Sequence, residues 1–122
     1  MTDVFNEARH AGEFLVSEAE GTRSRDTITI ASSVALEAGT VLGKITASGK
    51  YKLHDAAASD GTENAAGVLL SAVDASGGDA IGVAILRDAE VDTNALTFKS
   101  GISGANKTAA LDALKALGVI AR

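Results

Sequence analysis

The stretch that decides the fold is residues 39–54, which read GTVLGKITASGKYKLH. Its second half alternates polar and apolar residues, and Ser48-Gly49 separates this half from the first. Alternation over a few residues is typical of a half-buried strand, and a short turn with glycine between two such runs is typical of a hairpin. We therefore predict paired strands over residues 39–47 and 50–54.

More strands are predicted on either side of this hairpin. Residues 27–30 alternate polar and apolar, and residues 65–73 form a continuous apolar run, as expected for a strand buried on both faces. Gly77-Gly78 then turns the chain into a further apolar run at residues 80–86. Short strands at close spacing indicate a barrel or a sandwich. Glycines inside strands indicate bulges or close approaches between layers, and the three here are Gly43, Gly67 and Gly82.

The C-terminal part changes to a helical period. Ala110, Leu114 and Leu117 fall at i, i+4 and i+7, which predicts an amphipathic helix. Its candidate N-caps are Ser103 and Asn106, Gly118 suits the left-handed position after its end, and residues 119–121 are expected to return as a last strand. The predicted fold class is mostly β (α+β). We expect a small compact barrel-like or sandwich-like domain with one C-terminal helix and a flexible N-terminal arm.

Composition narrows the function classes. The chain has 122 residues, enough for one domain, and its 46% hydrophobic content includes only 3% aromatics. The net charge of -5 opposes binding to nucleic acid or anionic lipid, and the absence of cysteine excludes disulfides and thiolate metal sites. The N-terminus lacks the basic start and the apolar run that are typical of a signal peptide. No stretch approaches the ~20 apolar residues of a membrane span. We expect a soluble protein made in the cytoplasm.

Residues 1–27 differ in composition from the rest of the chain. They hold one apolar patch, Phe14-Leu15-Val16, and residues 18–26 contain almost nothing that a core could bury. Such a segment does not offset the entropy of its own ordering, so it is either a solvated tail or an arm that orders against a partner. The arginines could contact carboxylates of a partner, and the apolar patch could add as a strand to a sheet edge. We predict an arm over 1–27 and a compact body over 28–122.

One stretch resembles both a nucleotide-binding motif and a catalytic motif without completing either. Residues 101–108, GISGANKT, match a phosphate-binding loop except that Asn106 replaces its second glycine. Only a few residues follow the predicted helix, so we expect no complete nucleotide site, and a helix-capping loop is the preferred interpretation. The same stretch departs from a nucleophile elbow at Ala105, and the two histidines, His10 and His54, are expected to be solvated. We predict no enzyme activity.

Three acidic residues alternate along a charged segment, namely Asp88, Glu90 and Asp92. On a strand they would share one face, where a weak calcium site is conceivable. Calcium takes six to eight oxygen ligands, however, and charged side chains also protect strand edges from aggregation. Edge protection is therefore the preferred interpretation, and we predict neither a metal nor a cofactor.

Taken together, several segments resemble the lambda-type head decoration protein family of tailed phages. The resemblance spans nearly the whole chain in the expected order, and the segments that carry it are residues 11–18, 21–26, 38–45, 65–69 and 83–91 and the C-terminal helix with residues 117–122. One departure is visible. Where the family often has a Trp-Pro pair before the helix, this chain has Phe98-Lys99 and contains no proline.

The resemblance implies a structural viral protein that binds as a homotrimer to the outside of the expanded phage head and stabilises the capsid. Its partner would be the major capsid protein, its location the outer surface of the virion, and its place of synthesis the host cytoplasm. In the family the N-terminal arm orders on the capsid and contributes a strand there. The positions to which this capsid-binding role is carried over are Glu13, Phe14, Leu15, Val16, Ser17, Glu18, Arg23, Ser24, Arg25 and Asp26.

The sequence also allows one alternative function. A small β-rich module could instead recognise carbohydrate or another surface ligand. Sugar-binding faces usually stack aromatic rings on the sugar, and this chain offers one tyrosine, three phenylalanines and no tryptophan. The shortage of aromatics disfavours this alternative.

Overall fold

The computed structural model describes residues 11–21 and 23–122. In chain order its elements are β1 (Leu15–Glu18), β2 (Arg25–Ile30), β3 (Ala35–Leu36), β4 (Val41–Lys44), β5 (Tyr51–Leu53), β6 (Ala65–Leu69), β7 (Val73–Asp74), β8 (Ala80–Ile85), β9 (Ala89–Val91), the 3-10 helix η1 (Thr93–Ala95), α1 (Gly104–Ala116) and β10 (Val119–Ala121). Within these described residues, no helix has the length and hydrophobicity that crossing a bilayer requires.

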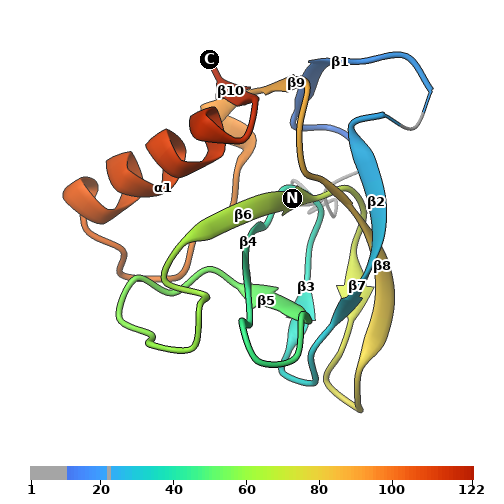
Figure 1. Ribbon diagram of the computed structural model, residues 1–122, viewed down its shortest axis with the longest axis vertical. Helices are drawn as coiled ribbons and strands as arrows, with labels where there is room; N and C mark the ends of the chain where they lie inside the picture. Colours follow the sequence, from blue (N-terminus) through green and yellow to red (C-terminus); the bar gives the residue numbers. More distant parts are fainter. Residues whose placement is uncertain (1–10, 22) are drawn as a thin grey trace, which may run out of the picture.

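A closed barrel forms the centre of the domain, with the strand order β2-β5-β4-β6-β8. Its longest ladder is the antiparallel pair β2–β8, which runs in register from Arg25↔Ile85 to Ile30↔Ala80. Two smaller sheets accompany the barrel, β1-β9-β10 and β3-β7. Figure 1 shows β1, β9 and β10 grouped at the top of the view, with α1 beside the barrel. The fold therefore matches the predicted mostly β class with one C-terminal helix.

The buried apolar residues form two clusters. One lies inside the barrel and includes Ile28, Ile30 and Leu42. The other joins the barrel to α1 and to the sheet β1-β9-β10, and it includes Ile85 of β8 and Leu114 of α1. Because the chain has few aromatic residues, both clusters consist mainly of aliphatic side chains, which fill less volume than rings. The backbones that enclose them must therefore approach one another closely.

Glycines inside the strands permit this close approach, as the sequence predicts. A Cβ on Gly43 would lie 2.5 Å from the Cα of Thr62, and one on Gly67 would lie 3.0 Å from the carbonyl oxygen of Ile85. A Cβ on Gly82 would lie 2.9 Å from the Val73 side chain. The ladder β4–β6 also shifts register between Leu42 and Gly43.

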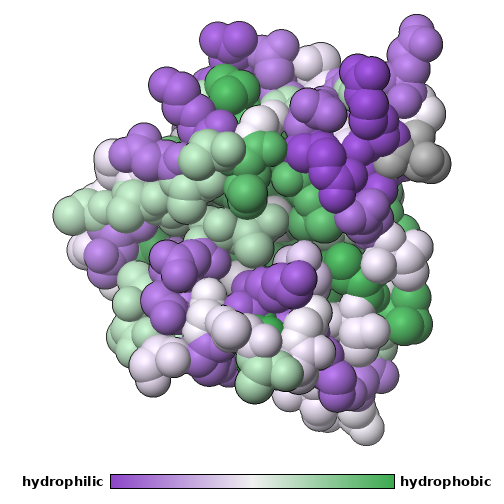
Figure 2. Space-filling view, in the orientation of Figure 1, coloured by the Kyte–Doolittle hydropathy of each residue, from purple (hydrophilic) through white to green (hydrophobic). Residues whose placement is uncertain are grey.

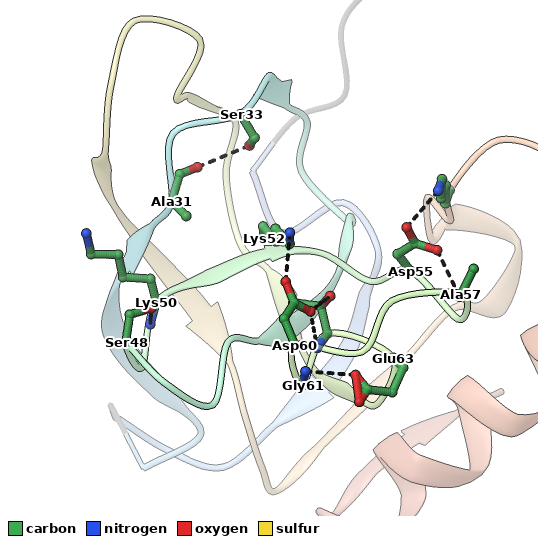
Figure 3. Close-up of polar contacts among 12 residues, drawn as sticks. Ala31, Ser33, Ser48, Lys50, Lys52, Asp55, Ala57, Asp60, Gly61 and Glu63 are labelled. Atoms are coloured by element: carbon green, nitrogen blue, oxygen red, sulfur yellow. Dashed lines mark hydrogen bonds and ion pairs between the residues drawn. The ribbon is translucent and has the colours of Figure 1, made fainter.

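The loop between β5 and β6 is held against Gly43 by its own polar contacts (Figure 3). Asp60 accepts hydrogen bonds from the backbone and hydroxyl of Thr62, and its other oxygen lies 2.9 Å from the Lys52 Nζ. Glu63 accepts a hydrogen bond from the Gly61 N–H. The hydrogen bond from the Thr62 hydroxyl has the largest effect on the pKa of Asp60, and that from Lys52 the next largest. Together they hold this pKa well below its usual range. These contacts keep the buried Thr62 in place over the barrel.

Several sequence predictions are confirmed. The hairpin appears as the antiparallel pair β4–β5, and residues 27–30 lie in β2. Ser103 is the N-cap of α1, since its hydroxyl accepts a hydrogen bond from the Asn106 N–H, and Gly118 has a φ of 94° directly after the C-cap. Residues 119–121 form β10.

Other details differ from the sequence prediction. Residues 65–73 do not form one strand, because β6 ends at Leu69 and Val73 begins β7, which pairs with β3 in a separate sheet. The expectation that His54 is solvated is wrong: it is 2% exposed, and its Nε2 lies 3.1 Å from the Glu63 carbonyl oxygen. His10 lies outside the described residues.

We predict that Gly43→Ala lowers the free energy of unfolding by about 1–3 kcal/mol, because the new methyl group collides with the Thr62 backbone. Gly77→Ala is the matched control. Its Cβ would meet nothing within 4 Å, so its effect should stay within about 0.5 kcal/mol. Urea unfolding measures the free energy of unfolding of both variants. Equal values would show that the barrel can accommodate a methyl group at Gly43.

Candidate functional site

The candidate capsid-binding site is the N-terminal segment, which we define as the described residues 11–21 and 23–26. Its strand β1 pairs antiparallel with β9, with Leu15 opposite Val91 and Glu18 opposite Ala89. The register shifts between Leu15 and Ser17, so Val16 lies at an irregularity. Its side chain is 57% exposed. The segment therefore lies against the body and presents an apolar side chain outward.

Phe14 anchors this segment to the body. Its ring is 1% exposed and belongs to the buried cluster that joins the barrel to α1 and β9. Its carbonyl oxygen accepts a hydrogen bond from the Asp92 N–H at 2.7 Å. A Cβ on Gly39 would lie 3.5 Å from the ring, an ordinary contact, but only 2.7 Å from the Ala95 carbonyl oxygen, so it is the Ala95 backbone that requires glycine beside Phe14. Phe14 is a core residue of the domain in this conformation.

Two charged residues within the N-terminal segment bind each other. The Arg25 Nε donates to the Glu18 Oε1 and Oε2 at 3.1 and 3.0 Å, and its Nη2 also donates to Oε1. The buried Ser24 hydroxyl donates to the same carboxylate. The hydrogen bonds from Arg25 lower the pKa of Glu18, against the opposing effect of burial, and Ser24 adds to the lowering. Glu18 and Arg25 are thus partners of each other.

Arg87 ties the same segment to the end of β8. Its Nη1 donates to the Arg23 carbonyl oxygen at 2.8 Å, and its Nη2 donates to Asp26 at 2.6 Å. Two backbone bonds reinforce this contact, from the Leu86 N–H to the Ser24 carbonyl and from the Ala19 N–H to the Asp88 carbonyl. The Arg23–Asp88 pair is 3.7 Å apart and largely exposed, so it contributes little.

The ten predicted capsid-binding residues therefore divide into two groups. Five face the body or are half-buried against it: Phe14, Leu15, Glu18, Ser24 and Arg25. Five are exposed: Glu13, Val16, Ser17, Arg23 and Asp26. Sequence reasoning did not separate the groups, because the bulge that turns Val16 outward depends on the pairing with β9. That residues 1–27 act as an arm that binds a partner stays a prediction.

The β1 strand also leaves backbone groups available. It lies at one end of the strand order β1-β9-β10, so within the described residues only one of its edges is paired with another strand. An edge strand presents N–H and C=O groups that an additional strand can bond. Val16 is exposed on this same strand. The arrangement can therefore bind an extended peptide through its backbone and through an apolar side chain.

The loop at residues 101–108 shows no comparable features. It borders a cavity of about 230 Å³, and Lys99 there forms an ion pair with Asp55 at 2.7 Å. The alternating acids also have partners: Glu90 is paired with Arg122, and Asp92 caps η1 by accepting from the Asn94 N–H. Among the described residues, no group of three or more His, Asp or Glu side chains could hold a metal ion.

The chain matches the model of a known family. The model of the family described as bacteriophage lambda head decoration protein D matches residues 4–119 of the chain. The matched range includes the segment built around Phe14 and runs through β9 and α1 into β10. A comparison with curated proteins finds no match.

We predict that Phe14→Ala and Val16→Ala differ sharply although the residues are two positions apart. Phe14→Ala should lower the free energy of unfolding by about 3–5 kcal/mol, since it leaves a cavity in the core. Val16→Ala should change it by no more than about 0.5 kcal/mol, since the side chain is exposed. Urea unfolding measures both. A small effect of Phe14→Ala would mean that the segment is not docked on the body in solution.

Proposed function

The chain belongs to the bacteriophage lambda head decoration protein D family, and on that basis we propose that it binds as a homotrimer to the outside of the expanded head and stabilises the capsid. It is a structural protein of the phage capsid, and that role needs no covalent chemistry. The family match over residues 4–119 carries the proposal, because it covers nearly the whole chain of 122 residues.

The proposed partner is the major capsid protein, and the proposed contact is the N-terminal segment. Two features of the segment support this assignment. The outer edge of β1 lacks a strand partner among the described residues, and Val16 is exposed beside it. We assign direct contact to the outward group of Glu13, Val16, Ser17, Arg23 and Asp26, and a positioning role to the inward group that includes Phe14 and Arg25.

Stabilisation follows from mass action. A protein that binds the assembled lattice and not the dispersed subunits adds its binding free energy to that of the assembly. A trimer increases the effect, because three linked contacts act as one avid contact when all three reach capsid subunits at once. Modest contacts at each N-terminal segment are then sufficient for tight attachment.

The carbohydrate-binding alternative finds no support in the described aromatic residues. Phe14 and Tyr51 are buried, at 1% and 8% exposure. Phe98 is half-buried, with the Lys107 Nζ 5.1 Å from its ring centre. None of these rings offers the open face on which a sugar would stack.

We predict that Val16→Asp weakens binding to expanded heads at least about tenfold, because it places a charge where an apolar contact is desolvated. Val34→Asp is the matched control, since Val34 is 55% exposed but lies beyond the opposite end of β2 from β1. Co-sedimentation with expanded heads measures the affinity, and circular dichroism checks the fold. Equal binding by both variants would place the capsid contact elsewhere. Point changes are preferable to removal of residues 1–26, which would also delete Phe14 from the core.

We further predict that saturating protein raises the temperature at which expanded heads rupture, since rupture must then also break the bonds between decoration protein and lattice. Electron microscopy or light scattering during a temperature ramp gives the rupture point. Heads mixed with the Val16→Asp variant at the same concentration serve as the control. An unchanged rupture temperature at full occupancy would contradict the stabilising role.

A further inference from the structure

The loop between β5 and β6 contains the one position in the sequence where an aspartate precedes a glycine, Asp60-Gly61. No asparagine in the sequence precedes a glycine. Because glycine has no side chain to shield its backbone nitrogen, this nitrogen can approach the carboxyl carbon of a preceding aspartate. An aspartate before glycine is for this reason the one most prone to isomerise. Asp60 is therefore a candidate site of chemical modification.

The isomerisation proceeds through a cyclic imide. The Gly61 nitrogen attacks the carboxyl carbon of Asp60, and the proton of this nitrogen leaves together with the carboxyl hydroxyl as water. A second water then opens the ring. Opening at one carbonyl restores aspartate, whereas opening at the other gives isoaspartate, whose main chain runs through the former side chain and is one atom longer. Because one water is released and one is consumed, the reaction needs no other reactant.

Packing requires the glycine of this pair. Gly61 has a φ of 108°, a conformation that residues with a side chain rarely adopt. A Cβ at this position would lie 2.5 Å from the Lys44 carbonyl oxygen and would also collide with the Thr46 hydroxyl. The main chain at Gly61 thus passes too close to the end of β4 and the residues after it for any larger residue. The fold therefore keeps the reactive pair in place.

The native loop opposes the reaction at the carboxyl group. Only a protonated carboxyl readily loses its hydroxyl as water, because the carbon of a carboxylate is a poor target for a nucleophile. The Asp60 Oδ1 accepts hydrogen bonds from the Thr62 hydroxyl and N–H, and its Oδ2 lies 2.9 Å from the Lys52 Nζ. These contacts lower the pKa of Asp60, the Thr62 hydroxyl most and Lys52 next. The protonated form that reacts is therefore scarce in the native loop.

The native loop also opposes the reaction at the nitrogen. The Gly61 N–H donates to the Glu63 Oε2 at 2.8 Å, and the Asp60 carbonyl oxygen accepts from the Thr46 N–H at 2.9 Å. The peptide group between Asp60 and Gly61 is thus hydrogen-bonded through both its N–H and its C=O, which restricts its rotation toward the carboxyl carbon. Figure 3 shows the contacts that join Lys52 to Asp60 and Gly61 to Glu63.

We propose that Asp60 is a latent isomerisation site, where isoaspartate forms when the loop opens and where Lys52 and Glu63 limit the rate. Loops whose polar contacts are open to water unfold locally, and the Lys52 and Asp60 side chains are 36% and 37% exposed. An extra main-chain atom would displace Thr62, which packs against Gly43, so the modified chain should be less stable. A capsid protein is not replaced after the particle leaves its host, so the modification would accumulate with age.

The test follows isoaspartate in the full chain during storage in mildly acidic buffer. The folded wild type is compared with the wild type unfolded in guanidinium chloride and with the folded variants Lys52→Met and Glu63→Ala. Lys50→Met is the matched control, since it removes an ion pair of similar exposure, with Asp79, and leaves the loop contacts intact. Labelling by isoaspartyl methyltransferase measures the rate, peptide mapping by mass spectrometry locates the modified residue, and circular dichroism verifies the fold.

Unfolding should raise the rate at Asp60 at least about tenfold, since it removes all of these contacts. Lys52→Met and Glu63→Ala should each raise it about fivefold, the effect of one lost polar contact, and Lys50→Met should leave it unchanged. Equal rates in the folded and unfolded wild type would overturn the protection by the loop. Absence of isoaspartate at Asp60 in the unfolded chain would overturn the site itself. Equal acceleration by Lys50→Met would overturn the role of the two contacts, because general destabilisation would then explain the rates.

Discussion

The burial of Phe14 is the contact on which the arrangement of the domain depends. The ring comes from a segment that is otherwise polar, and it lies in the cluster that joins the barrel, α1 and the sheet β1-β9-β10. Among mostly aliphatic neighbours, one aromatic side chain provides a large share of the apolar surface buried there. Once Phe14 is in place, β1 pairs with β9, and β9 in turn pairs with β10 at the end of α1. Both ends of the described chain are thus attached to one strand.

The barrel satisfies a different constraint, which is that small side chains must fill its interior without voids. Aliphatic residues achieve this only if opposing backbones come close, and the glycines at 43, 67 and 82 allow that approach. The buried Thr62, held by Asp60, occupies the space that a side chain at Gly43 would need. Loop and strand are therefore matched to each other, so the polar contacts of the loop between β5 and β6 contribute to core packing as well as to the surface.

The parts of the fold that sequence predicts well are those with a local signal. The β4–β5 hairpin is marked by alternation and a glycine turn, and α1 by its apolar period, its serine cap and the glycine after its end. The strands β3 and β9 lack such a signal, since one has two residues and the other contains Glu90. The burial of His54 and Phe14 depends on elements distant in sequence, so the local pattern gave no indication of it. For the same reason the predicted binding residues could be named from sequence but not divided into inward and outward groups.

This division changes how the N-terminal segment can work as a binding element. A segment free of the body would lose conformational entropy on the capsid along its whole length, whereas one held by Phe14, Arg25 and Arg87 has already lost most of it. The contacts within the domain therefore lower the entropic cost of attachment, although the residues that make them do not contact the partner. They also fix the position of β1, the strand that carries both the exposed Val16 and the edge that has no strand partner among the described residues. In a trimer the same rigidity sets the spacing of three binding edges, and avidity requires that spacing to match the lattice. In the proposed trimer, the inward residues would thus determine whether the three outward contacts can form together.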